Sequence, residues 1–225
     1  MRTTAIEHGC VESPEYHIKE RREILPFVPK TCSTLLDIGC ASAEFGALVK
    51  RERQNVQVWG VEVNATVAAA AAAKIDRVIT SDFASDIDLP DNYFDVVTFN
   101  DCLEHFPDPF PPLELAKRKL KPGGTLICSL PNVRYADNMR HLIMEMDWRY
   151  EGWGVRDRTH LRFFTRKSMI RTIEEAGYAV VSIDGINESE YYLRNFTMRV
   201  LRRLFRKWTE DMLYQQYVVV AVAAA

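Results

Sequence analysis

The sequence lacks several features that would assign it to a particular class of protein. Its five cysteines form no C-x-x-C pair, which argues against a zinc site or a disulfide framework. The formal net charge of −2 predicts neither a nucleic-acid-binding protein nor an acidic tail. The longest apolar run, residues 217–225, is too short to span a bilayer, and residues 1–16 lack the apolar segment of a signal peptide. We therefore expect a cytoplasmic protein that does not bind nucleic acid.

The chain also lacks internal repeats and long Gly/Ser-rich or Pro-rich linkers, and a length of 225 residues suits one domain over 1–225. Short apolar runs alternate with segments of helical composition, a pattern typical of a parallel sheet with helices on both faces. Strands are expected at residues 35–38, 56–63, 77–80, 94–99, 125–130, 179–183 and 214–222, and helices at 44–53, 65–74, 112–120 and 167–176.

Polar or small residues follow the first four predicted strands, where an α/β sheet binds its ligands. Gly39 follows the first strand, Glu62 ends the second, Asp82 follows the third and Asn100 follows the fourth. A carboxylate in the position of Glu62 can accept hydrogen bonds from the two hydroxyls of a ribose. Only Gly39 and Gly46 are present in place of a G-x-G-x-x-G pattern, so an NAD-dependent oxidoreductase is the less favoured reading.

Five motifs in order resemble those of the class I S-adenosylmethionine-dependent methyltransferases. They are Leu35-Leu36-Asp37-Ile38-Gly39-Cys40, Gly60-Val61-Glu62, Ser81-Asp82-Phe83, Phe94-Asp95-Val96-Val97 with Leu103-Glu104-His105, and Leu120-Lys121-Pro122-Gly123-Gly124. The resemblance places the cofactor-binding core at 30–131, with S-adenosyl-L-methionine as cofactor and S-adenosyl-L-homocysteine as product. It also implies an α/β fold: a seven-stranded, mostly parallel, doubly wound sheet with an antiparallel last strand, helices on both faces and a small lid insertion.

The same resemblance implies roles for individual residues. The backbone from Gly39 to Ala41 would hold the methionine part, Glu62 the ribose hydroxyls and Asp82 the adenine amino group. Ala43 stands where the family often has glycine, and a positive φ there would cost about 1 kcal/mol. The expected cofactor-binding residues are Tyr16, Asp37, Gly39, Cys40, Ala41, Glu62, Val63, Asp82, Phe83, Asn100 and Leu103.

Residues 129–134 and 157–165 resemble a narrower group, the methyltransferases of glycan and O-antigen biosynthesis. We therefore expect residues 132–165 to form a lid on the acceptor side. The Met, Trp and Tyr side chains within it suit sugar rings as well as flat phenols. Arg156, Arg158 and Arg162 are candidates for binding a phosphate or carboxylate on the acceptor.

An alcohol acceptor needs a base, and a positioned imidazole can remove its proton as the new bond forms. His160 is the first candidate, and Asp157 would orient it if this segment is one helical turn. His105, just beyond the fourth strand, is the second candidate. The oxygens of Asp101, Glu104 and Asp157 allow a metal-dependent variant, but their spacing is not diagnostic and no metal is assigned.

The leading hypothesis is an enzyme of polysaccharide biosynthesis that O-methylates a small acceptor, a sugar, glycan precursor or nucleotide sugar. One alternative is O-methylation of a phenolic or quinone precursor, because Leu103-Glu104-His105 also resembles the ubiquinone-pathway enzymes. Another is a non-catalytic interaction protein that keeps the fold.

Residues 192–208 hold six basic residues and no acidic one, with apolar side chains spaced at three and four. This pattern predicts an amphipathic helix. Such a helix either contacts an anionic membrane or a partner protein, or packs its apolar stripe on its own domain.

Overall fold

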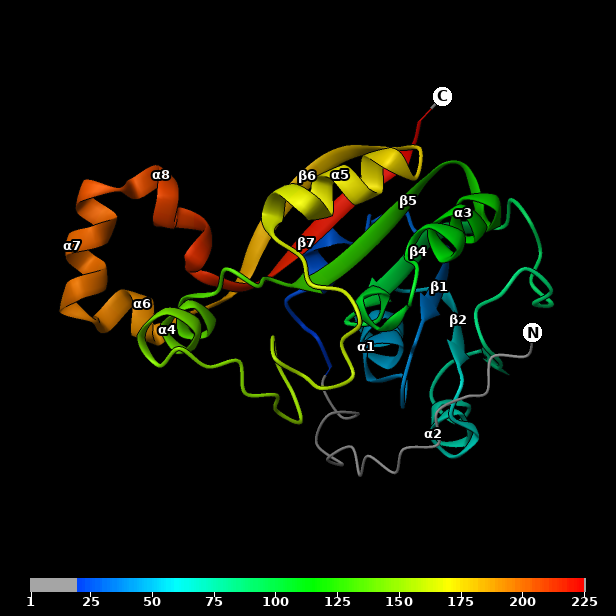
Figure 1. The fold of residues 1–225 in the computed structure, drawn as a ribbon. Coiled ribbons are helices and arrows are strands. Elements are labelled where there is room, and N and C mark those ends of the chain that lie inside the picture. The colour runs from blue at the N-terminus through cyan, green and yellow to red at the C-terminus, as the bar shows by residue number, and fades with distance from the viewer. Residues whose placement is uncertain (1–19, 225) are drawn as a thin grey trace.

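A seven-stranded sheet forms the centre of the computed structural model, which describes residues 20–224 (Figure 1). The strand order is β3-β2-β1-β4-β5-β7-β6, and only β7 runs antiparallel to its neighbours. The predicted fold class is therefore confirmed. The strands are β1 Thr34–Ile38, β2 Gln57–Glu62, β3 Arg77–Thr80, β4 Phe94–Asn100, β5 Leu120–Pro131, β6 Tyr178–Glu188 and β7 Tyr214–Ala223.

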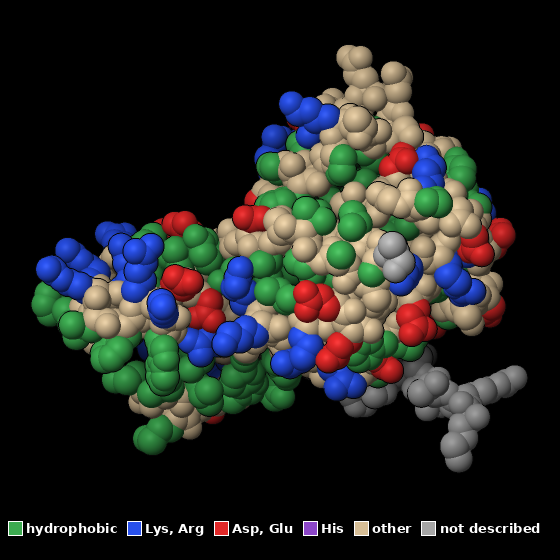
Figure 2. All heavy atoms as spheres, turned by 90° about the horizontal axis from the view of Figure 1, so that it is seen from above, with side chains coloured by type: hydrophobic (Ala, Val, Ile, Leu, Met, Phe, Trp, Pro, Cys, Tyr) green, Lys and Arg blue, Asp and Glu red, His purple; other side chains and the backbone are tan. Residues whose placement is uncertain are grey.

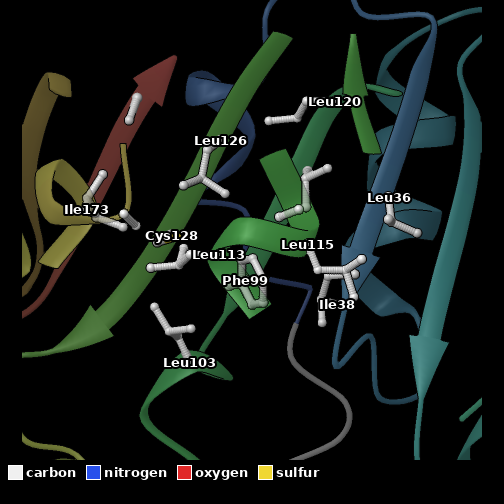
Figure 3. Close-up of a cluster of buried hydrophobic side chains, with 14 of the residues drawn as sticks. Leu36, Ile38, Phe99, Leu103, Leu113, Leu115, Leu120, Leu126, Cys128 and Ile173 are labelled. Carbon is white, nitrogen blue, oxygen red and sulfur yellow. The ribbon is translucent and has the colours of Figure 1, made fainter. Parts of the chain in front are cut away.

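Helices cover both faces of this sheet because successive residues of each buried strand point to opposite sides. Leu35 enters one core with α1 (Glu44–Glu52) and α2 (Ala65–Ala71). Leu36 enters the other core with α3 (Phe110–Lys119) and α5 (Arg166–Glu175), as Figure 3 shows. Strands apolar on both faces thus produce the three-layer arrangement expected from their sequence.

The turn between β1 and α1 has an unusual backbone. Gly39 has a φ of +67°, and a Cβ atom there would lie 2.5 Å from the sulfur of Cys102, so this position requires glycine. Ala41 and Ala43 also have positive φ, at 47° and 58°. The strain suspected at Ala43 is therefore present, and the chain holds two alanines in a conformation that costs each about 1–2 kcal/mol.

A helical arm projects from one end of the sheet (Figure 1). It comprises α4 (Ala136–Met144), which the sequence did not predict, with α6 (Glu190–Arg194), α7 (Phe196–Leu204) and α8 (Arg206–Thr209). The expected continuous helix over 192–208 is wrong, because the backbone is extended at Asn195, whose side chain caps α7, and non-helical again at Phe205. Short 3-10 turns complete the fold: η2 Leu25–Phe27, η3 Leu103–His105 and η4 Glu210–Met212.

The apolar stripe of α7 does not pack on the rest of the described chain. No residue of α7 is buried, and the side chains of Phe196 and Trp208 are 76% and 78% exposed. Figure 2 shows hydrophobic and basic side chains gathered at this end of the molecule. Within residues 20–224, no helix has both the length and the apolar character needed to cross a bilayer.

Candidate active site

Two cavities lie along the carboxyl edge of the parallel strands. Cavity A, of about 450 Å³, follows β1 to β4, and cavity B, of about 610 Å³, lies on the side of β5, β7 and the 132–165 segment. Cavity A is lined by Gly39, Glu62, Val63, Asp82, Phe83 and His105 among others. Six of the predicted site residues thus share one cavity, while Tyr16 lies outside the described residues.

Glu62 is held in place at the end of β2 by two backbone amides. Oε2 accepts a hydrogen bond from the amide of Ala41 at 3.0 Å, and Oε1 accepts one from Asn64 at 2.8 Å. A carboxylate oxygen has room for a further donor, so each oxygen of Glu62 keeps an acceptor site. This arrangement fits two neighbouring ribose hydroxyls.

The backbone amides of the β1–α1 turn differ from the expected picture. Those of Gly39 and Cys40 both donate to the carbonyl of Val61, at 2.9 and 3.1 Å, and that of Ala41 donates to Glu62. These three amides therefore have partners within the protein. A ligand beside the turn must rely on other atoms of this backbone.

Asp37 lies behind cavity A rather than in its wall. It is 2% exposed, and its Oδ1 accepts hydrogen bonds from Thr98 Oγ1 at 2.5 Å and Asn100 Nδ2 at 3.2 Å. Burial raises the pKa of Asp37 to about 6. Asn100 Oδ1 is buried without a partner in the described structure. Asp37 thus positions Asn100. Leu103 is fully buried and belongs to the core.

Most of the residues that line cavity B are charged or polar. It is lined by Arg21, Asp101, Glu104, Trp153, His160 and Gln216 among others. Arg21 forms an ion pair with Asp101, and Gln216 also donates to that carboxylate. Trp153 is 60% exposed and offers an aromatic face beside these polar groups.

His105 lines cavity A, and the neighbouring His160 lines cavity B. Their ring centroids are 4.9 Å apart in an edge-to-face arrangement, although the residues come from different segments. Glu104 joins the segments, because its carbonyl accepts hydrogen bonds from the amides of Leu161 and Arg162 at 2.9 and 3.0 Å. Burial and the neighbouring His105 lower the pKa of His160 to about 4, and burial raises the pKa of the Glu104 carboxyl to about 8.

Comparison with known proteins identifies the family. The family of methyltransferase domains matches residues 14–183, which is most of the chain. The chain belongs to this methyltransferase family. The methyltransferase is 28% identical over 136 residues to demethylmenaquinone methyltransferase of Listeria welshimeri (56% of this chain, 58% of that protein). It is 27% identical over 157 residues to the ubiquinone biosynthesis O-methyltransferase of Idiomarina loihiensis (68% of this chain, 64% of that protein). It thus spans less than two thirds of either relative.

A solved structure, a SAM-dependent methyltransferase from Archaeoglobus fulgidus, has the same fold as this methyltransferase. The TM-score is 0.68 at 24% identity, with 89% of this chain and 91% of that chain covered. Family and fold together support S-adenosylmethionine as the cofactor. The resemblance to class I enzymes is thereby confirmed, whereas the glycan subgroup remains a prediction.

Several side chains on the acceptor side have partners that differ from those expected. Asp157 forms an isolated β-bridge with Glu151 and is not part of a helix, and its Oδ1 accepts hydrogen bonds from the amide and hydroxyl of Thr159. Arg156 bonds to Glu151 and to the carbonyl of Arg149, and Arg162 to the carbonyl of Pro107. These contacts assign the two arginines to the internal bracing of the methyltransferase.

The buried carboxyl of Glu104 is the site feature that sequence reasoning missed. The sequence offered it only as one oxygen ligand, in a set with Asp101 and Asp157. In the described structure Asp101 pairs with Arg21, and Glu104 instead lies with the two histidines. The adjacency of Glu104 and His105 after β4 was the one available signal.

Proposed function

We propose that this methyltransferase transfers a methyl group from S-adenosylmethionine to a hydroxyl of a sugar or glycan precursor. The supporting observation is cavity B, whose lining residues are mostly charged or polar and whose His160 contacts His105 of cavity A. A hydroxyl-rich acceptor finds hydrogen-bonding partners in such a cavity, and Trp153 offers a face for a sugar ring. In this proposal residues 132–165 form the acceptor-side lid over a core at 30–131.

Within cavity A, we assign binding of the ribose hydroxyls to Glu62 and of the adenine amino group to Asp82. Asn100 would lie beside the sulfonium, where its unpartnered Oδ1 meets positive charge. When bound, S-adenosylmethionine supplies a methyl group on an excellent leaving group, so the protein contributes mainly proximity and orientation.

We assign removal of the hydroxyl proton to His160, with His105 as the second candidate. The acceptor O–H bond breaks and the proton moves to the imidazole. The new O–CH₃ bond forms as the S–CH₃ bond breaks, which gives a methyl ether and S-adenosylhomocysteine. The proton then passes to water, and no oxidation state changes at the protein.

The test is a methyl-transfer assay with a panel of nucleotide sugars, lipid-linked glycans and catechols, read by mass spectrometry. A mass gain of one methyl group on a sugar-containing acceptor supports the proposal. Methylation of catechols alone would replace it with the second candidate, O-methylation of a quinone precursor. The ubiquinone-biosynthesis relative favours that candidate. Turnover by His160→Ala equal to that of the unmodified chain would exclude His160 as the base and leave the proton transfer to His105 or to proximity alone.

A separate test concerns Glu62. Glu62→Gln should weaken S-adenosylmethionine binding, measured by calorimetry, by about 1.5–3 kcal/mol, as expected for a hydrogen bond to a charged group. An unchanged affinity would contradict the ribose assignment.

We also propose that α7 and α8 contact an anionic membrane surface. Phe196, Leu204 and Trp208 are exposed, and the six basic side chains between residues 194 and 207 are exposed around them. Buried apolar area and attraction to anionic lipid both favour such binding. The full chain should sediment together with vesicles that contain phosphatidylglycerol. The double variant Phe196→Ser, Trp208→Ser should stay in the supernatant. Val181→Ser, at an exposed apolar position on β6, is the control. Sedimentation unaffected by the paired change would refute the contact.

A further inference from the structure

The carboxyl of Glu104 is buried without a hydrogen-bond partner. Its side chain is completely inaccessible to solvent, and neither Oε1 nor Oε2 has a partner among residues 20–224. The basic group nearest to it is His160, whose Nε2 lies 3.8 Å from Oε1 of Glu104. A buried polar group without a partner is costly and rare in native proteins. This arrangement therefore points to a ligand that pairs with the carboxyl.

The two neighbouring histidines are held in the orientation that metal-binding imidazoles adopt. Nδ1 of His105 lies 3.2 Å from the carbonyl of Thr159, and Nδ1 of His160 lies 3.4 Å from the carbonyl of Val155. A carbonyl only accepts, so in each neutral ring Nδ1 carries the hydrogen and Nε2 keeps its lone pair. Metal-binding histidines commonly fix their other nitrogen in this way.

We propose that Glu104, His105 and His160 form a binding site for a divalent transition-metal ion. One ligand atom from each residue lies within 4.8 Å of the others. Zinc bonds of about 2.0–2.1 Å in a tetrahedral site place two ligand atoms about 3.3 Å apart. The 3.8 Å between Glu104 and His160 thus needs a closure of about half an ångström.

The donor set and the surroundings fit such an ion. Two imidazoles with one carboxylate favour zinc, cobalt or nickel over magnesium or calcium. Glu104 and His160 border cavity B and His105 borders cavity A, so the cluster lies next to both cavities. Three protein ligands leave a fourth position, the arrangement of catalytic rather than structural zinc.

The consequence for the chemistry rests on the proposed function. A divalent ion at this junction would lower the pKa of an acceptor hydroxyl in cavity B. The hydroxyl proton then leaves to water, and in the metal-loaded protein this step replaces proton transfer to His160. The bonds formed and broken in methyl transfer stay the same. Binding of the ion itself does not depend on the acceptor.

The test is calorimetric titration of Zn²⁺ into the full chain, stripped beforehand with a chelator, without cofactor or acceptor. We expect one ion per chain, with at least tenfold weaker binding to Glu104→Gln and His160→Gln. His141→Gln is the matched control, because His141 lies on α4 and contacts Glu145 and Arg140 outside the cluster. It should bind as the unmodified chain does.

Lack of Zn²⁺ binding by the unmodified chain would overturn the proposal. Equal binding by all variants would also overturn it, because the ion would then lie elsewhere. If His160→Gln fails to fold, Glu104→Gln decides alone, since glutamine keeps the shape of the side chain. Because no methyl transfer is measured, loss of the metal site and failure of the proposed function are distinguishable.

Discussion

Replacing Asp37 by asparagine should change how the stability of this protein depends on pH. The carboxyl lies beneath cavity A, 2% exposed, and its Oδ1 accepts from Thr98 and Asn100. Asparagine keeps an acceptor oxygen for these two donors but cannot ionise. The substitution therefore removes a buried charge with little change in shape.

The magnitude follows from the pKa of Asp37, which burial raises from 3.8 to about 6. Hydrogen bonds from Thr98 and Asn100 and the charge of Arg21 act against this increase, and Glu62 adds to it. Between pH 3.8 and about pH 6, Asp37 has lost its proton in the unfolded chain but keeps it in the folded protein, so rising pH favours unfolding. At about 1.4 kcal/mol per pH unit, the loss of stability approaches about 3 kcal/mol above pH 6.

Urea unfolding of both proteins at pH 4, 5, 6 and 7 measures this difference. Relative to the unmodified chain, Asp37→Asn should gain about 2.4 kcal/mol of unfolding free energy between pH 4 and pH 7, because part of the change is already present at pH 4. Any free-energy cost of burying the asparagine amide is the same at each pH, so it does not affect the change in the stability difference with pH. A constant difference across the range would refute the account of Asp37 as a buried, destabilising charge.

Two further substitutions test the packing and charge of the sheet. Asp95→Asn should lower stability at pH 7 by about 1.5–3 kcal/mol. Burial opposes ionisation there, but hydrogen bonds from Lys121, Ser33 and Thr34 outweigh it and hold the pKa of Asp95 well below its usual value. The ionised Asp95 carboxylate stabilises the fold above the pKa of the unfolded chain, and this contribution is lost as the pH falls. In urea unfolding, the stability difference between the two proteins should therefore narrow below pH 4. A difference that stays constant with pH would contradict this. Gly60→Ala should cost about 1–3 kcal/mol in the same assay, because its new Cβ would lie 2.5 Å from Cys40 Sγ, whereas Gly152→Ala, with open space around it, should change little. Equal stability of these two alanine variants would show that the strand tolerates the crowding.

The meeting of several polar residues around cavity A was predictable from local sequence. Short continuous apolar runs identify strands buried on both faces, and polar residues at their ends must meet at one edge of a parallel sheet. Glu62 and Asp82, predicted in this way, both line cavity A, whereas Asn100 is not among its lining residues. The strain at Ala43 was equally visible, because a turn that favours glycine there has a positive φ whatever surrounds it.

The sequence alone determined the fold class, the family and the edge of the sheet that forms the site, because these depend on residues close together in the chain. Only the tertiary structure decided that Glu104 points inward beside His160 and that Asp157 turns to Thr159. It also decided that the apolar stripe of α7 is exposed. Those outcomes depend on which distant segments pack together, since burial and hydrogen-bond partners are properties of the assembled chain.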